Sequence, residues 1–138
     1  MSHAAQIAIV DDDDAVRNAL SSLLRSFGYA IRGYQSAEAF LDDRDHPDPA
    51  CMIVDVQMPG VSGSDLQAQL LAHGRRFPMI FMTAFPTDAI RRQVMEAGAH
   101  AYLSKPVDGD TMARCVDLAL STTPGRKGSI RSSPESSA

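Results

Sequence analysis

Three short apolar runs constrain the fold more than any other feature of this sequence. They are Ile7–Val10, Met52–Val54 and Met79–Met82. Runs of this length, followed by turn residues or by a helical pattern, are typical of strands that are buried on both faces of a sheet. Two further segments, 29–34 and 101–104, also indicate strands, and the mixed polarity of the first favours an edge position.

Helical patterns separate these strands. Apolar residues recur at helical spacing from Val16 to Phe27, and Gly28 follows as a stop signal. Four more helices are predicted: a short one from the N-cap Ser36 to about Leu41, and others over 64–73, around 90–97, and after a capping Asp108. Five strands that alternate with five helices predict an α/β fold, a doubly wound parallel sheet with helices on both faces.

Length and composition predict one domain with a tail. The chain has 138 residues, of which 1–120 are expected to form the domain; Ser, Thr, Pro and Gly dominate 121–138, which predicts a disordered tail. The formal net charge is −4, and Arg126, Lys127 and Arg131 are too few to indicate direct nucleic-acid binding.

The sequence also predicts a cytoplasmic protein. Its longest apolar runs are far too short to cross a membrane, and residues 1–6 lack the basic and apolar regions of a signal peptide. Cys51 and Cys115 have no metal-ligand spacing, and their apolar surroundings favour buried thiols over a disulfide.

Polar side chains stand where four of the strands end. They are the pair Asp11–Asp12, then Asp55, Thr83 and Lys105. Because the carboxyl ends of parallel strands share one edge of the sheet, these side chains are expected to converge there. The two aspartates that follow, at positions 13 and 14, are better explained as the cap and first turn of the next helix.

This set of residues suits phosphoryl transfer. The carboxylates of Asp11, Asp12 and Asp55 repel one another unless a cation lies among them, and Mg²⁺ prefers such oxygen ligands. An aspartate can act as a nucleophile and form an acyl phosphate, and here Asp55 is the candidate. Thr83 and Lys105 could then bind the phosphoryl oxygens by hydrogen bond and charge.

The motifs resemble those of the response-regulator receiver domains of bacterial two-component signalling. They are Ile-Val-Asp-Asp at 9–12, Asp-Val-Gln-Met-Pro-Gly at 55–60, Met-Thr-Ala at 82–84 and Lys-Pro at 105–106, within a match from about residue 7 to 120. The resemblance implies a flavodoxin-like sheet in the order 2-1-3-4-5, and phosphorylation of Asp55 by a histidine kinase or a phosphotransfer protein. It also implies that Mg²⁺ is held by Asp12, Asp55 and the backbone carbonyl of Gln57, with Asp11 acting through water.

Further expectations follow from the same resemblance. Thr83 and Lys105 are implied to bind the phosphoryl group, Tyr102 to act with Thr83 as the conformational switch, and the Lys105–Pro106 bond to be often cis. Most receivers of this family are joined to an output domain, but the sequence leaves no room for one after the fifth helix, so the expected protein is a stand-alone regulator and not an enzyme. It is expected to relay its signal to a downstream protein through the face formed by the fourth helix, fifth strand and fifth helix. It would be a monomer or a phosphorylation-dependent dimer.

Three alternatives remain open on the sequence. An aspartyl-phosphate hydrolase has a similar nucleophile, but its family typically carries a second aspartate where this chain has Gln57. A receiver-like module that is never phosphorylated would not need the full set of aspartates, threonine and lysine. A nucleotide-binding fold would be expected to have a glycine-rich loop after the first strand, and none is present.

Overall fold

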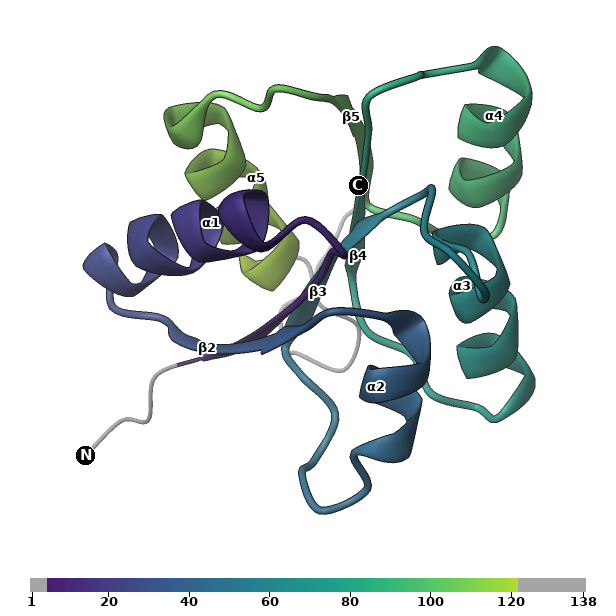
Figure 1. Cartoon of the computed structure of the whole chain (residues 1–138), viewed down its shortest axis with the longest axis horizontal. Helices are drawn as coiled ribbons and strands as arrows, with labels where there is room; N and C mark the ends of the chain where they lie inside the picture. The colour runs from purple at the N-terminus through teal and green to yellow at the C-terminus, as the bar shows by residue number, and fades with distance from the viewer. Residues whose placement is uncertain (1–4, 122–138) are drawn as a thin grey trace, which may run out of the picture.

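The structure is a computed structural model that describes residues 5–121. In this part of the chain five strands alternate with five helices, as predicted (Figure 1). The elements are β1 (Gln6–Val10), α1 (Asp14–Ser26), β2 (Ala30–Tyr34), α2 (Ala37–Asp42), β3 (Cys51–Asp55), α3 (Gly63–Ala72), β4 (Met79–Thr83), α4 (Asp88–Glu96), β5 (Ala101–Ser104) and α5 (Gly109–Ser121).

All neighbouring strands pair in parallel, in the order β2-β1-β3-β4-β5. Every residue of β3 and of β4 is buried, which explains why these two strands consist almost entirely of apolar residues. The strands at the two edges, β2 and β5, are only partly buried. The predicted topology and the predicted edge position of β2 are both confirmed.

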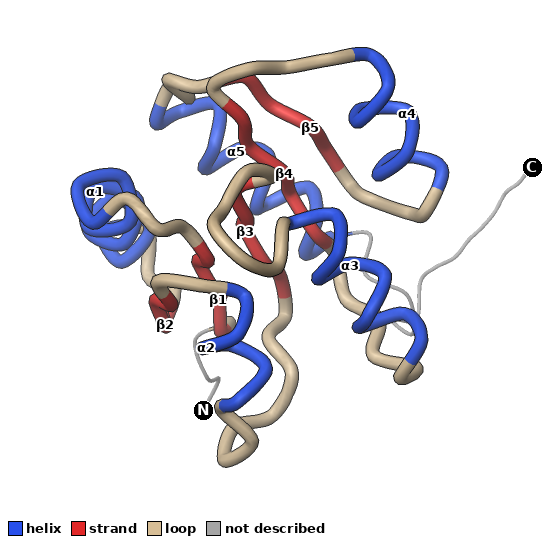
Figure 2. Tube along the Cα trace, turned by 45° about the vertical axis from the view of Figure 1, so that its right-hand side comes forward, coloured by secondary structure: helices blue, strands red, loops and turns tan. Residues whose placement is uncertain are grey.

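Two hydrophobic cores lie on opposite faces of the sheet. Helices α1 and α5 cover one face, and α2, α3 and α4 cover the other (Figures 1 and 2). Successive strand residues point to alternate faces, so Ile53 joins the core beneath α1 and α5 whereas Val54 joins the other one. Phe81 is fully buried in the second core, and its truncation to alanine would cost about 3–5 kcal/mol.

Polar caps fix where the helices begin. Asp13 caps α1 and Ser36 caps α2, both as the sequence predicts, and Asp108 accepts a hydrogen bond from Thr111 N–H in the first turn of α5. Helix α3 begins one residue earlier than expected. Its cap is Ser62, because the Ser62 hydroxyl and the Asp65 carboxylate form a reciprocal capping box.

The structure also shows the state of both cysteines, only one of which is fully buried. Cys51 is buried, Cys115 is half-buried, and both thiols are free. Among residues 5–121, no helix combines the length and the apolar character needed to cross a bilayer. Ser121 ends α5, and the rest of the predicted tail lies outside the described residues.

Candidate functional site

The carboxyl edge of the sheet brings together the side chains that end four strands. Asp11 directly follows β1, Asp55 is the last residue of β3, Thr83 is the last residue of β4, and Lys105 follows β5. Asp11 continues the sheet by one hydrogen bond, since its N–H donates to Tyr34 O at 3.0 Å. The parallel register therefore places residues from distant parts of the chain at one edge, as the sequence predicts.

Three carboxylates form the centre of this edge. Asp11, Asp12 and Asp55 each offer one oxygen, and these oxygens all lie within 4.8 Å of one another. Asp11 is fully buried and Asp55 is only 6% exposed, whereas Asp12 is open to solvent. The two buried carboxylates, with Asp12 beside them, repel one another at this distance, so a cation close to them stabilises the cluster.

Lys105 supplies one positive charge to two of the carboxylates. Its Nζ lies 3.0 Å from Asp11 Oδ2 and 3.1 Å from Asp55 Oδ2. The contact with Asp55 is a hydrogen bond, but Asp11 Oδ2 is buried and accepts no aligned hydrogen bond. One lysine therefore balances part of the negative charge and leaves a buried carboxylate oxygen with electrostatic contact only.

Burial and charge act differently on the two partners of this ion pair. Burial raises the pKa of Asp55 above its usual range; the Gln57 N–H and the Lys105 ammonium oppose this, and the neighbouring Asp11 adds to it. For Lys105, burial lowers the pKa, but the close contacts with the two aspartates and their negative charges outweigh it, so the pKa is raised. The difference arises because the lysine meets two anions, whereas Asp55 shares one cation with Asp11.

The donor set fits Mg²⁺. It offers carboxylate oxygens from Asp11, Asp12 and Asp55, the oxygen ligands that this hard cation prefers. The buried Asp11 Oδ2, which lacks an aligned donor, is an oxygen that a cation or its hydration shell would satisfy. The exposed Asp12 leaves the site open toward solvent, as a metal that keeps some of its waters needs.

The loop after β3 holds Asp55 by its backbone. Gln57 N–H donates to Asp55 Oδ1 at 3.0 Å, and Gly63 N–H donates to Val56 O at 2.9 Å, which closes the loop. A Cβ on Gly63 would lie 2.5 Å from Asp55 O, so only glycine fits there. Sequence reasoning missed Gly63, because its Ser-Gly-Ser setting resembles any turn and contains no sign of the close approach.

Thr83 and Tyr102 each contact one end of the loop that connects β4 to α4. Thr83 is almost fully buried, and its Oγ1 accepts a hydrogen bond from Phe85 N–H at 3.0 Å. The Tyr102 hydroxyl accepts one from Thr87 N–H at 3.2 Å, at the residue that caps α4. The structure thus links the predicted switch residues to one short loop, residues 84–87.

Comparison with known proteins decides the family. The family model described as response regulator receiver domain matches residues 7–117, most of the chain. The chain belongs to this family.

Relatives and solved structures agree with this assignment. The chain is 37% identical over 134 residues to transcriptional regulatory protein FixJ of Azorhizobium caulinodans, and 36% identical over 124 residues to response regulator protein TodT of Pseudomonas putida. Among solved structures it is similar to the crystal structure of FixJ-N, with a TM-score of 0.78 and 29% identity over 88% of this chain and 97% of that one. It is also similar to response regulator StyR, with a TM-score of 0.77 and 35% identity over 86% of this chain and 60% of that one.

This receiver domain spans only part of its curated relatives. The matches cover 96% of this chain but 64% of FixJ, and 90% of this chain but 55% of TodT. The activities and partners of those whole proteins therefore do not transfer with the fold. The expected stand-alone organisation stays a prediction.

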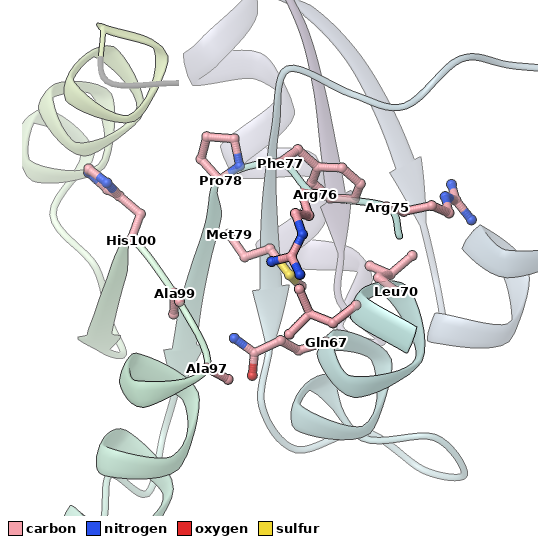
Figure 3. A pocket seen from close by; sticks show the side chains of 12 residues that line it. Gln67, Leu70, Arg75, Arg76, Phe77, Pro78, Met79, Ala97, Ala99 and His100 are labelled. Atoms are coloured by element: carbon pink, nitrogen blue, oxygen red, sulfur yellow. The ribbon is translucent and has the colours of Figure 1, made fainter. Parts of the chain in front are cut away.

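The receiver also has a cavity far from the acidic edge. It has a volume of about 360 Å³ and lies at the amino ends of β4 and β5, between the C-terminal ends of α3 and α4 (Figure 3). Its walls include Leu70 and Met79, and the side chains of Arg75 and His100 on its rim point away from one another. Because these polar groups do not converge, the acidic edge is the better candidate for the receiver's chemistry.

Proposed function

We propose that the receiver accepts a phosphoryl group on Asp55 from a phosphohistidine, carried by a histidine kinase or a phosphotransfer protein. The observation that carries this proposal is the position of Lys105 Nζ, 3.0–3.1 Å from both Asp11 Oδ2 and Asp55 Oδ2, within a cluster of three carboxylates. A lysine held at the edge of such a cluster can move its charge to a new anionic group without a change of fold. Asp55 pairs with Met82 of the neighbouring strand β4, and the next residue of that strand, Thr83, offers a hydroxyl.

The transfer needs a nucleophile, a leaving group and charge neutralisation. An oxygen of the Asp55 carboxylate forms a bond to phosphorus as the donor's P–N bond breaks, and the electron pair of that bond returns to the imidazole nitrogen. The product is an acyl phosphate, and attack by water later restores the carboxylate and releases inorganic phosphate. Mg²⁺ would be held by Asp11, Asp12, Asp55 and the Gln57 carbonyl, and it would neutralise charge on the phosphoryl oxygens. Lys105 and Thr83 bind those oxygens from the protein side.

The role of the chain in this scheme is that of a phosphoacceptor. Its residues assist their own phosphorylation and dephosphorylation, and it is not classed as an enzyme. Gln57 is exposed and carries no acid, so the loop after β3 does not present the second aspartate of a small-molecule phosphohydrolase. The expected setting is the cytoplasm, as a monomer or a phosphorylation-dependent dimer that contacts a downstream protein and not DNA directly.

The signal is proposed to leave through the face formed by α4, β5 and α5. When Thr83 turns toward the phosphoryl oxygens, it releases Phe85 N–H, which its Oγ1 holds in this structure. The loop 84–87 is then free to move, and the Tyr102 hydroxyl, which contacts Thr87 at its other end, can follow. Phosphorylation would thus bias an equilibrium between two arrangements of α4 and Tyr102 through contacts made in only one of them.

Intact mass measurement tests the chemistry. The full chain is incubated with Mg²⁺ and a small phosphodonor such as phosphoramidate, and one added phosphoryl group is expected. Asp55→Asn keeps the size of the side chain but removes the nucleophile, so it should gain none. Phosphorylation of that variant at the rate of the parent chain would contradict the assignment of Asp55.

A threonine variant tests the route of the signal. Thr83→Ala should still be phosphorylated, but amide chemical shifts around Tyr102 and α4 should no longer change on phosphorylation. Thr83→Ser keeps the hydroxyl and is the matched control, so it should retain those changes. The proposed route fails if the parent chain shows shift changes around Asp55 alone.

A further inference from the structure

One arginine contacts the acidic turn from outside the carboxylate cluster. Arg17 lies in α1, and its Nη1 donates a hydrogen bond to the backbone oxygen of Asp11 at 2.6 Å. Its Nη2 contacts the Asp14 carboxylate at the start of the same helix. The Arg17 side chain is 17% exposed, whereas that of Asp14 is 76% exposed, so the contact with Asp11 is the sheltered one.

That contact completes the anchoring of Asp11. The Asp11 N–H donates to Tyr34 O, its Oδ1 accepts from Asp13 N–H at 2.8 Å, and its backbone oxygen is bound by Arg17. A peptide unit is planar, so fixing the carbonyl of Asp11 also fixes the orientation of the N–H of Asp12 and the direction in which the chain continues. The two carboxylates on either side of this peptide therefore depend on it for their positions.

The stem of Arg17 passes close to Gly33 of β2. Gly33 lies beneath it, and a Cβ at that position would be 3.2 Å from Arg17 Cδ and 3.4 Å from Arg17 Cγ. A larger residue at position 33 would push against the stem, while the guanidinium at its far end is bound to two acceptors. Gly33 thus gives the arginine room to reach across to Asp11.

We infer that Arg17 is a positioning residue for the metal-binding carboxylates of Asp11 and Asp12. It acts through the backbone of the turn after β1 and does not touch the cation or the phosphoryl group. This inference rests on the proposed function, because it assigns Arg17 a role in preparing the same site. Groups that orient the direct ligands of a metal usually affect its affinity by about 10- to 100-fold.

The shape of the Arg17 guanidinium distinguishes a positioning role of this residue from a purely electrostatic one. The planar guanidinium donates to Asp11 O and Asp14 from two different nitrogens, a geometry that a lysine ammonium cannot reproduce. If Arg17 acted only by placing a positive charge near the aspartates, Arg17→Lys would behave like the parent chain. If it acts by position, Arg17→Lys should lose most of the Mg²⁺ affinity that Arg17→Ala loses.

Calorimetric titration with Mg²⁺ is the test. We expect the dissociation constant of the full chain to rise about tenfold in Arg17→Ala and to rise by most of that amount in Arg17→Lys. Arg25→Ala, on the exposed last turn of the same helix, is the matched control and should bind Mg²⁺ like the parent. The phosphorylation rate with phosphoramidate at limiting Mg²⁺ should fall in parallel, and saturating Mg²⁺ should restore most of it.

A second substitution perturbs the contact between Arg17 and Asp11 and leaves the arginine itself unchanged. Gly33→Val should displace the stem of Arg17 and weaken Mg²⁺ binding, yet add nothing further in an Arg17→Ala background. Unchanged Mg²⁺ affinity in both Arg17→Ala and Gly33→Val, or full additivity of the two, would overturn the inference. A parent chain that binds Mg²⁺ but gains no phosphoryl group would instead refute the proposed function and leave the positioning role standing.

Discussion

Charged side chains are arranged differently at the amino edge of the sheet, where the strands begin, and at the carboxyl edge, where they end. At the amino edge, Arg75 and Asp48 form a pair at 2.7 Å with both side chains partly in solvent, and Arg75 also lies over the Phe40 ring, 5.2 Å from its centre. At the carboxyl edge, one lysine faces two carboxylates that are almost fully buried. The Asp48–Arg75 pair is therefore balanced within itself, whereas at the carboxyl edge one positive charge faces two buried carboxylates.

This contrast separates stabilising charges from functional ones. An exposed pair such as Asp48–Arg75 contributes between zero and about 1 kcal/mol, because solvent screens it. Buried carboxylates that share a single cation raise the free energy of the folded state, and under the proposed function their chemistry is the reason for this cost. Four predictions test the contrast, and they are ordered from the largest expected effect to the smallest.

Removal of Lys105 should have the largest effect on stability. Lys105→Ala leaves Asp11 buried without its cation, and loss of one partner of a buried pair costs about 3 kcal/mol or more. Because a divalent cation can replace the missing charge, Mg²⁺ should restore more stability to this variant than to the parent. Chemical denaturation with and without Mg²⁺ measures both effects, and a loss no larger than that of Arg75→Ala would contradict the contrast.

Mg²⁺ should stabilise the parent chain through Asp12. A ligand that binds only the folded state adds about 1.4 kcal/mol at ten times its dissociation constant. Asp12→Ala should lose most of this gain and most phosphorylation, and in EDTA it should melt higher than the parent because it relieves repulsion among the carboxylates. Thermal melts in EDTA and in millimolar Mg²⁺ decide the point. A lower melting temperature for the variant in EDTA, together with equal Mg²⁺ effects on both proteins, would exclude the charge-cluster explanation.

The pKa of Asp55 predicts a dependence of stability on pH. Burial raises this pKa in the folded state, so the folded chain holds its proton at pH values where the unfolded chain has lost it. The stability contributed by Asp55 is thus greatest below its unfolded pKa and falls as pH rises through the folded pKa. At neutral pH without metal, Asp55→Asn should be more stable than the parent by on the order of 1 kcal/mol, and this difference should shrink toward pH 4. Denaturation curves across that range provide the measurement; a difference that grows toward acid pH would have the wrong sign.

The amino edge should show the smallest effects. Asp48→Asn breaks the pair with Arg75 and should cost less than about 1 kcal/mol, an effect that salt reduces further. Its phosphorylation and its response to Mg²⁺ should match those of the parent chain, since no residue of the acidic cluster is touched. Intact mass and thermal melts provide both measurements, and a marked loss of phosphorylation would show that the two edges are coupled.

Much of this architecture could be predicted from the sequence because its signals are local. Apolar runs such as Met52–Val54 marked the buried strands, and the polar residues at their ends marked the edge that carries the candidate site. The order of the strands needed the family resemblance, since alternation of strands and helices fits several orders. The prediction of residues 64–73 for α3 was one residue late, because Ser62 and Ser64 are equally plausible caps until the Asp65 carboxylate is seen to complete the box with Ser62.

The parts that could not be predicted depend on contacts between different elements of the fold. Arg17 occupies an ordinary polar position in an amphipathic helix, and nothing nearby in the sequence indicates that it reaches back to Asp11. Gly33 and Gly63 look like a weak strand residue and a turn residue. A Cβ at position 33 would press on the Arg17 stem, and one at position 63 would clash with the backbone of Asp55. Such requirements appear only once the elements are packed together.

The ion pair between Lys105 and Asp55, which joins residues 50 positions apart, also has a consequence for synthesis. Lys105 follows β5, which comes after the other four strands of the described residues, so a growing chain has its aspartates before it has the lysine that partly neutralises them. A nascent or truncated chain that stops before β5 has Asp11 and Asp55 without this cation and lacks one residue of the proposed acceptor site. Under the proposed function, such a chain would gain the ability to accept a phosphoryl group only after β5 and Lys105 have been made.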